Sequence, residues 1–208
     1  MAARVAVVDY GMGNIGSISK MLRHVGAEPI VSADPQQLRA ADKLILPGVG
    51  HFDRAMANLH AAGLVDELKE LVQTRGTPIL GICLGMQLMC RSSEEGTQPG
   101  LGFVEARVRR FDFPGDRRLK VPHMGWRDLQ LAKPSEIFDG LDDASRFYFV
   151  HSYFVDCSEE RDVLARATYG HPFVAAFERD NVRGVQFHPE KSHRFGIRLL
   201  QNFVSDTK

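Results

Sequence analysis

The chain has few cysteines, no excess of charge and no long hydrophobic run. Its three cysteines, Cys83, Cys90 and Cys157, form an odd, sparse set that argues against a disulfide framework and fits a reducing cytosol. The 26 basic residues balance the 26 acidic residues, so we expect no charge-driven binding to nucleic acid or to a membrane surface. The sequence therefore argues against a disulfide-stabilised protein and against one that binds nucleic acid or a membrane surface through its charge.

We also expect no membrane-spanning or targeting segment. The longest mostly apolar stretch, 78–90, is shorter than the ~20 residues of a spanning helix. The apolar run before Asp9 is too short for a signal peptide. No Cys/His spacing suggests a metal site, and we expect no cofactor. The sequence therefore predicts a cytoplasmic protein.

Strands and helices alternate in the first half of the chain. Hydrophobic residues make up 44% of the 208 residues, enough for a core in one domain spanning residues 1–208. We expect strands at residues 4–9, 28–32, 43–46 and 77–80, and helices at 15–25, from 35, at 52–71 with a break near Gly63, and at 86–91. This order predicts an α/β fold with a doubly wound, mostly parallel sheet, helices on both faces, and a site at the carboxyl ends of the strands.

The second half is rich in β-like segments with few helices between them. The expected strands lie at residues 103–111, 126–131, 146–155, 163–169, 173–178 and 182–187, before a closing helix at 193–204. Such short, closely spaced strands indicate antiparallel additions to the same sheet.

The stretch Gly81-Ile82-Cys83-Leu84-Gly85 reads as a nucleophile elbow between a buried strand and a helix. In this turn the middle residue lies on a sharp bend with its side chain exposed, and the glycines avoid collisions with the neighbouring strand and helix. The helix N-terminus beside Cys83 favours its thiolate. A tight structural turn is the alternative interpretation of the pentapeptide alone.

About a hundred residues later, His188-Pro189-Glu190 follows an expected strand. The period-2 geometry points the side chains of His188 and Glu190 to the same side, and the proline stiffens the segment. A carboxylate behind a histidine orients the ring and favours the imidazolium. Alone, this is an ordinary histidine–glutamate pair at a strand end; together with the elbow it predicts a triad of Cys83, His188 and Glu190.

The segment Pro47-Gly48-Val49-Gly50 ends another apolar strand. Amide or ester hydrolysis requires N–H groups aimed at the developing oxyanion, each contributing ~3 kcal/mol. This glycine loop can supply one such group, and Leu84, just after the nucleophile, can supply another. The alternative interpretation of a Pro-Gly pair is a plain turn.

Taken together, these motifs resemble the triad-type class I glutamine amidotransferases over essentially the whole chain. Within that class, the chain is most similar to the glutaminase subunits of imidazole glycerol phosphate synthases. The motifs that carry this closer resemblance are Asp9-Tyr10-Gly11-Met12-Gly13-Asn14, Pro47-Gly48-Val49-Gly50, Pro122-His123-Met124-Gly125-Trp126, Tyr148-Phe149-Val150-His151-Ser152-Tyr153 and His188-Pro189-Glu190-Lys191-Ser192. One departure is Arg127, where the family usually has asparagine.

The resemblance implies hydrolysis of glutamine and delivery of ammonia to a (β/α)8-barrel cyclase in a heterodimer. The cyclase would make imidazole glycerol phosphate and aminoimidazole carboxamide ribotide in histidine biosynthesis. The residues given a function by resemblance comprise the oxyanion donors Val49 and Leu84, the substrate-binding residues Gly48, Gly50, Gln87, Glu95, Ser152 and Tyr153, and the partner-facing residues Asn14, Trp126 and Lys191. Open alternatives are a glutaminase for another synthase, such as that of the pyridoxal phosphate pathway, a stand-alone γ-glutamyl hydrolase, and a non-enzymatic binding module.

Two further patterns admit a functional and a structural interpretation. The run Gly11-Met12-Gly13-Asn14-Ile15-Gly16 and the later Asp34 match a dinucleotide-binding fingerprint, but a triad has no function in such a domain. The basic residues around the Phe113-Pro114-Gly115-Asp116 turn suit a solvated hairpin or docking to an acidic partner. These basic residues are Arg107, Arg109, Arg110, Arg117, Arg118 and Lys120.

Overall fold

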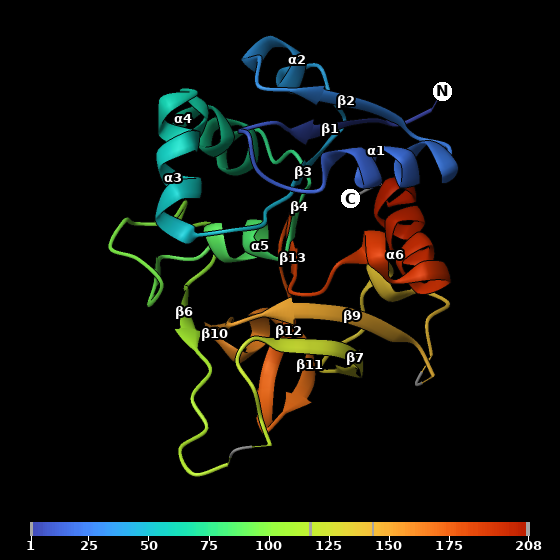
Figure 1. Cartoon of the computed structure of the whole chain (residues 1–208). Helices are drawn as coiled ribbons and strands as arrows, with labels where there is room; N and C mark the ends of the chain where they lie inside the picture. The colour runs from blue at the N-terminus through green and yellow to red at the C-terminus, as the bar shows by residue number, and fades with distance from the viewer. Residues whose placement is uncertain (1, 117, 143, 207–208) are drawn as a thin grey trace.

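The computed structural model describes residues 2–206 except 117 and 143. A large mixed sheet runs through the molecule, with helices against its parallel half (Figure 1). The strands are β1 (Arg4–Val8), β2 (Glu28–Ser32), β3 (Lys43–Leu46), β4 (Ile79–Ile82), β5 (Ser92–Ser93), β6 (Ala106–Arg110), β7 (His123–Asp128), β8 (Gln130–Leu131), β9 (Arg146–His151), β10 (Tyr153–Cys157), β11 (Val163–Tyr169), β12 (His171–Arg179) and β13 (Val182–Val185). The helices are α1 (Ile15–His24), α2 (Pro35–Arg39), α3 (Phe52–Ala61), α4 (Leu64–Lys69), α5 (Leu84–Leu88) and α6 (His193–Ser205), with a π-helical turn at Glu70–Thr74 and 3-10 turns at Glu136–Phe138, Glu160–Asp162 and Pro189–Lys191.

The parallel half of the sheet has the order β2-β1-β3-β4-β13. The late strand β13 therefore lies beside β4, with Gly184 opposite Gly81 and Val185 opposite Ile82. Because both strands run in the same direction, their carboxyl ends meet at one edge of the sheet. The segments after β4 and after β13, far apart in sequence, leave the sheet side by side.

Alternating side chains of the parallel strands build two cores. On β1, Val5 and Val7 belong to the cluster that includes α1 and α6, whereas Ala6 and Val8 belong to the cluster that includes α3 and α4. Figure 1 shows α1 and α6 on one side of these strands and α3 and α4 on the other. Each fully buried Val or Leu contributes about 1.5–3 kcal/mol, so the near-continuous apolar strands are stable only with both faces covered. The predicted doubly wound α/β class is confirmed.

The second half differs from the prediction in three respects. The expected strand at 182–187 was assigned to the antiparallel additions, but β13 pairs parallel with β4. The expected strand at 126–131 is divided at Leu129 into β7 and β8, which belong to different sheets. The expected strand at 146–155 is wrong: Ser152 separates β9 from β10, and the two strands join different sheets. β10 pairs with β6 and β12 in the large sheet, while β9 pairs with β7 in a separate two-stranded sheet. Phe147, Phe149 and Val155 are all buried, so the period-2 pattern continues across the break and conceals it.

Smaller differences concern element ends. The helix after the elbow begins at Leu84 and ends at Leu88, rather than spanning 86–91, and the strand before it continues to Ile82. The two-residue strand β5, which pairs with β6, was not predicted. No helix in the described part of the chain is both long and apolar enough to cross a membrane.

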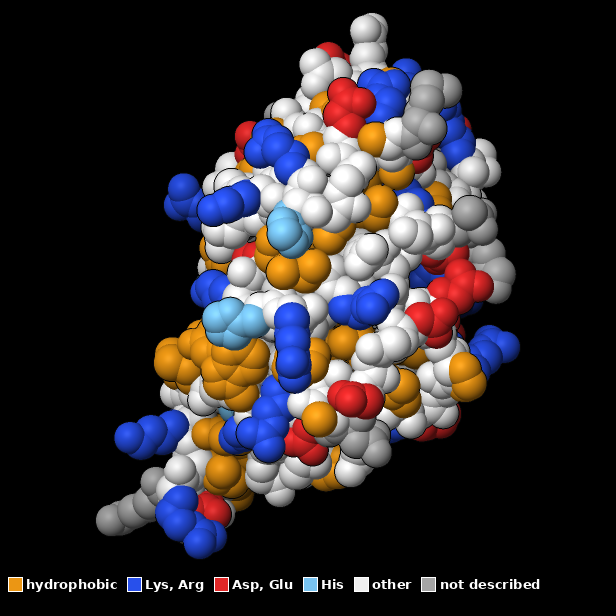
Figure 2. Space-filling view, turned by 90° about the vertical axis from the view of Figure 1, so that its right-hand side faces the viewer, with side chains coloured by type: hydrophobic (Ala, Val, Ile, Leu, Met, Phe, Trp, Pro, Cys, Tyr) orange, Lys and Arg blue, Asp and Glu red, His pale blue; other side chains and the backbone are white. Residues whose placement is uncertain are grey.

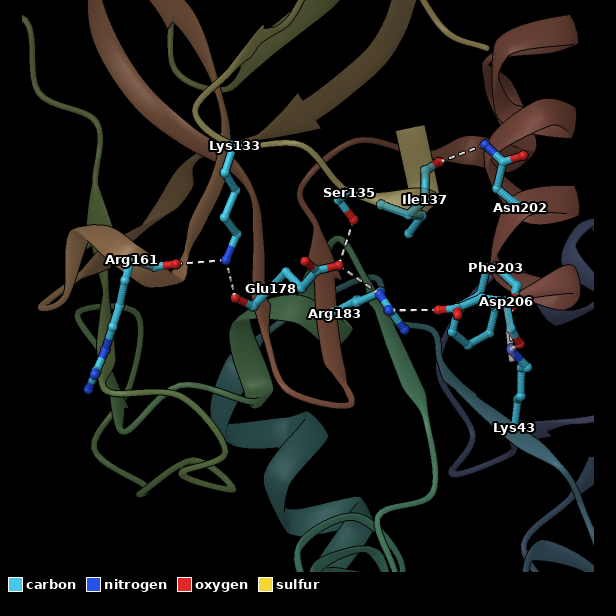
Figure 3. A network of polar contacts seen from close by, with 10 residues as sticks. All are labelled: Lys43, Lys133, Ser135, Ile137, Arg161, Glu178, Arg183, Asn202, Phe203 and Asp206. Carbon is cyan, nitrogen blue, oxygen red and sulfur yellow. Dashed lines mark hydrogen bonds and ion pairs between the residues drawn. The ribbon is translucent and has the colours of Figure 1, made fainter. Parts of the chain in front are cut away.

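A buried polar cluster fastens the end of α6 to the sheet edge opposite the elbow (Figure 3). Arg183 at the start of β13 donates from Nε to Glu178 at 2.9 Å and forms an ion pair with Asp206 at 2.6 Å. Lys43 at the start of β3 donates from Nζ to the carbonyl oxygen of Phe203 at 2.7 Å and to that of Asp206. These contacts fix β13 at one end, and its other end leads to His188.

Candidate active site

Cys83 occupies a strained turn between β4 and α5. Its φ is 54°, a left-handed conformation that costs a non-glycine residue about 1–3 kcal/mol. A Cβ on Gly81 would lie 2.8 Å from the Cα of Met86, and one on Gly85 would lie 1.8 Å from the carbonyl oxygen of Leu46. Both glycines are therefore required by close backbone approach, as the elbow interpretation predicted.

His188 and Glu190 leave β13 next to the elbow. His188 Nδ1 lies 2.8 Å from Glu190 Oε1, and the two side chains are only 2% and 1% exposed. The hydroxyl of Ser192 donates to the His188 carbonyl oxygen at 2.6 Å, and the His188 N–H donates to the Tyr148 carbonyl oxygen at 2.9 Å. His188 is thus held in place by a contact to its ring and by contacts to its backbone N–H and carbonyl groups.

The electrostatics of this group favour a charged imidazole. Burial alone lowers the pKa of His188, but hydrogen bonds to Cys83 and Glu190 and the charges of both groups outweigh it, and the pKa rises to about 10. An imidazolium at neutral pH is the partner that a cysteine thiolate needs.

A pocket of about 300 Å³ opens beside the cysteine. It is lined by most of the residues that the sequence analysis predicted, namely Val49, Gly50, Cys83, Leu84, Gln87, Glu95, Ser152, Tyr153, His188 and Lys191. Gly48 is not among the lining residues, but a Cβ on it would lie 2.7 Å from the N atom of Gly85, so the loop packs directly on the start of α5. Pro122, Val150 and His151 complete the wall and were not predicted as site residues.

Both expected oxyanion donors belong to the lining of this pocket. Leu84 is the first residue of α5, so its N–H belongs to the helix start and has no acceptor within the helix. Val49 is exposed, and the loop before it is held by the Tyr10 hydroxyl, which donates to the Pro47 carbonyl oxygen at 2.6 Å. Burial, and to a smaller degree the charge of Cys83, raises the pKa of Tyr10, which stays a donor.

Two of the expected partner-facing residues, Trp126 and Lys191, lie near the ring of Tyr148 at the pocket. Trp126 is 37% exposed and stacks on His193 with ring centroids 5.3 Å apart. Lys191 lines the pocket, and its Nζ lies 5.8 Å from the ring centroid of Tyr148. Asn14 precedes α1 and makes no side-chain cap to it. On the face shown in Figure 2, apolar side chains and histidines gather at the height of β7 and β9 in Figure 1, flanked by Lys and Arg side chains.

The glycine run near the N-terminus has a packing explanation. Gly13 has φ of 115°, and a Cβ on it would lie 2.8 Å from the Cβ of Pro47. Close contact with the loop at 47–50 is therefore a sufficient reason for a glycine at position 13.

The basic residues near the 113–116 turn are largely ion-paired. Arg109 lies near Glu94 and Asp156, and Arg118 bonds to Asp116. Arg117 lies outside the described residues. Among residues 2–116, 118–142 and 144–206, no group of three or more His, Cys, Asp and Glu side chains is arranged to hold a metal ion.

Comparison with known proteins identifies the family to which this geometry belongs. The family model described as Glutamine amidotransferase class-I matches residues 6–207. The chain belongs to this family. Its motifs predicted this class, and the prediction is confirmed: the protein is a class I glutamine amidotransferase.

Curated relatives and solved structures agree with the assignment. The chain is 48% identical to imidazole glycerol phosphate synthase subunit HisH 2 of Methanococcus maripaludis, over 96% of this chain and 98% of that protein. It is 47% identical to subunit HisH 1 of Campylobacter jejuni, with the same two coverages. PurLQS from Thermotoga maritima shares the fold, with a TM-score of 0.73 at 21% identity over 98% of each chain. The glutaminase domain of CTPS from Trypanosoma brucei also aligns, with a TM-score of 0.66 at 20% identity over 98% of this chain and 92% of that one.

Proposed function

We propose that this amidotransferase hydrolyses glutamine to glutamate and ammonia with a Cys83–His188–Glu190 triad, and that it does so as the glutaminase subunit of an imidazole glycerol phosphate synthase. The observation that carries the triad is a buried imidazole that is bonded to Glu190 and lines the same pocket as Cys83, whose interaction with the ring helps to raise the pKa of His188. Relatives near 48% identity that are named as subunits of that synthase support the choice of pathway.

The chemistry follows from the protonation state of His188. The Cys83 thiolate attacks the side-chain carbonyl carbon of glutamine, and the carbonyl oxygen becomes an oxyanion that accepts from the N–H groups of Leu84 and Val49. His188 gives a proton to the nitrogen as the C–N bond breaks, so ammonia leaves and a thioester remains. His188, now neutral, takes a proton from water, which attacks the thioester. Glutamate leaves, and the thiolate and imidazolium are restored.

The substrate would lie along the pocket wall. In this proposal its α-groups meet Gly50, Gln87, Glu95 and the backbone of 152–153, with Gly48 holding the loop against α5. Glu95 accepts from the Phe52 N–H through Oε2 at 2.9 Å, which fixes its carboxylate and leaves the other oxygen for an α-ammonium.

Ammonia released into water at neutral pH is protonated and ceases to be a nucleophile, so a closed route to a second active site is physically sensible. The partner we propose is a (β/α)8-barrel cyclase in a heterodimer, which uses the ammonia to form imidazole glycerol phosphate and aminoimidazole carboxamide ribotide. Asn14, Trp126 and Lys191 would face it. The exposed apolar ring of Trp126 beside the pocket supports this choice, because exposed aromatic residues are enriched at interfaces.

Two further parts of the proposal concern organisation and location. We propose that residues 1–208 act as one glutaminase domain, which the family match over 6–207 supports. We also propose a cytoplasmic location, because the chemistry needs a free thiol and Cys83, Cys90 and Cys157 are all unpaired with each other.

The test is glutamate release by the purified chain, alone and with the cyclase carrying its ribotide substrate. We expect slow hydrolysis by the chain alone and a steep rise only in the loaded complex. A rate that is high without the cyclase and indifferent to it would point instead to a stand-alone γ-glutamyl hydrolase. Activation by the synthase of the pyridoxal phosphate pathway would reassign the partner.

A further inference from the structure

Two buried histidines face each other on the small sheet behind the pocket. His123 on β7 is the direct cross-strand neighbour of His151 on β9. His123 Nδ1 lies 3.0 Å from His151 Nε2, and His151 Nδ1 lies 2.8 Å from the carbonyl oxygen of Tyr153. His151 and Tyr153 line the pocket, whereas His123 is fully buried behind them and does not.

The direction of these hydrogen bonds is determined by one atom. The Tyr153 carbonyl oxygen can only accept, so His151 Nδ1 must carry a proton and donate it. Burial lowers the pKa of His151 to about 3 and that of His123 to about 4, so both rings are neutral near pH 7. His151 Nε2 is then an acceptor, and His123 Nδ1 must be the donor to it. Both histidines are therefore fixed as Nδ1–H tautomers.

The same carbonyl orients an amide on the other side. Gln87 Nε2 donates to the Tyr153 carbonyl oxygen at 3.1 Å and to Gln186 Oε1 at 3.0 Å. Gln186 Nε2 in turn lies 3.7 Å from Cys83 Sγ. Because the carbonyl oxygen accepts only, the amide of Gln87 cannot be reversed without repulsion between two oxygens. Both of its N–H groups are committed to the protein, which leaves Oε1 as the atom that a ligand can reach.

We propose that His123 is a remote positioning residue for the glutamine pocket, holding His151, the Tyr153 carbonyl and the Gln87 amide in one fixed arrangement. This inference rests on the proposed glutaminase function, since it assigns a purpose to residues around that site. His123 touches neither the pocket nor the triad. The Nδ1 proton of His123 makes the hydrogen bond that lies farthest from the pocket. The series continues through His151 and the Tyr153 carbonyl oxygen to the amide of Gln87, which lines the pocket.

The alternative is that His123 is a core residue that only fills space. It packs against the ring of Tyr169 with centroids 4.1 Å apart and lies 5.4 Å from that of Phe149. A space-filling role requires the ring but makes no use of the Nδ1 proton. Substitutions that remove the hydrogen-bond donor but keep the size of the side chain therefore distinguish the two interpretations.

The matched pair is His123→Asn and His123→Leu. Asparagine puts an N–H donor where the imidazole has Nδ1, and leucine has nearly the same shape without a donor, so both variants lose the same ring packing. We expect the KM for glutamine to rise about tenfold in His123→Leu, the size of effect of one buried hydrogen bond, while kcat changes less. In His123→Asn we expect the KM to stay within about threefold of the wild type. Equal KM values in the two variants would overturn the positioning role.

A second measurement does not depend on catalysis. Nitrogen-detected NMR of the histidine rings in the wild-type chain should show His123 and His151 as neutral Nδ1–H tautomers at pH 7. An Nε2–H tautomer for His151 would overturn the proposal even if both variants failed to fold. Because this spectrum is independent of glutamine hydrolysis and of the cyclase, a failure of the proposed function and a failure of the positioning role give different results.

Discussion

The charge of Glu190 can be separated from its hydrogen bond by one substitution. Glu190 accepts from His188 Nδ1 through Oε1, while its buried Oε2 has no hydrogen-bond partner in the described part of the chain. Glu190→Gln keeps the accepting oxygen and replaces the unpartnered oxygen by an amide nitrogen of similar size. The substitution therefore removes the negative charge and leaves the geometry in place.

The expected magnitude follows from the pKa of His188. Burial opposes its protonation, yet Cys83 and Glu190 together raise the pKa from 6.5 to about 10. A hydrogen bond to a charged group contributes about 1.5–3 kcal/mol and a neutral one about 1 kcal/mol, so losing the charge of Glu190 should cost the imidazolium about 1–2 kcal/mol. We expect kcat/KM for glutamine to fall about 5–30-fold in Glu190→Gln. Removing a contribution that raises the pKa lowers it, so the alkaline limb of the pH profile should move to lower pH.

The assay is glutamate release measured from neutral to alkaline pH for the wild type, Glu190→Gln and Glu190→Asp. The aspartate variant keeps the charge but shortens the side chain, so it should lose rate with a smaller displacement of the alkaline limb. Thermal unfolding of all three proteins controls for loss of the fold. A Glu190→Gln enzyme with an unchanged rate and an unchanged alkaline limb would refute the assigned function of this carboxylate.

Three other predictions concern stability. Gly85→Ala should cost about 3 kcal/mol or more in urea unfolding, because its Cβ would lie 1.8 Å from the Leu46 carbonyl oxygen; a wild-type unfolding midpoint would contradict the elbow geometry. Burial lowers the pKa of His151 to about 3, against 6.5 for a free histidine. Between these two pH values the unfolded state binds more protons than the folded state, so the free energy of unfolding falls as the pH drops, by about 1.4 kcal/mol per pH unit. His151→Phe should make this decline in unfolding free energy shallower, and an unchanged slope would refute the assignment. Asp206→Ala leaves Arg183 with one carboxylate fewer and should cost about 3 kcal/mol by thermal or urea unfolding, whereas a neutral result would mean that the polar cluster at the end of α6 adds nothing to stability.

Local patterns predicted the backbone geometry around the proposed triad because its constraints are local. Two glycines around Cys83 and a proline between His188 and Glu190 restrict the backbone within a few residues, and such restrictions are visible in a linear sequence. The parallel pairing of β13 with β4, which brings the segments after both strands to the same sheet edge, was not predicted, because the strand at 182–187 was assigned to the antiparallel additions. The functions assigned to the substrate-binding and partner-facing residues remain predictions.

Contacts between distant residues of ordinary appearance could not be predicted. His123 and His151 are separated by 28 positions, and each lies in an aromatic strand where a core histidine is the usual interpretation. The break at Ser152 was missed because the buried positions keep their period on both sides of it. Gln186 carries no motif, and only its burial against Cys83 distinguishes it.

Capture of the covalent intermediate would show directly whether Cys83 is the nucleophile. The protein is mixed with labelled glutamine, quenched in acid within the first turnover, digested and analysed by mass spectrometry. We expect a γ-glutamyl adduct on Cys83, none on Cys90 or Cys157, and no glutamate release by a folded Cys83→Ala variant. An adduct on another residue, or turnover that survives in Cys83→Ala, would contradict this expectation.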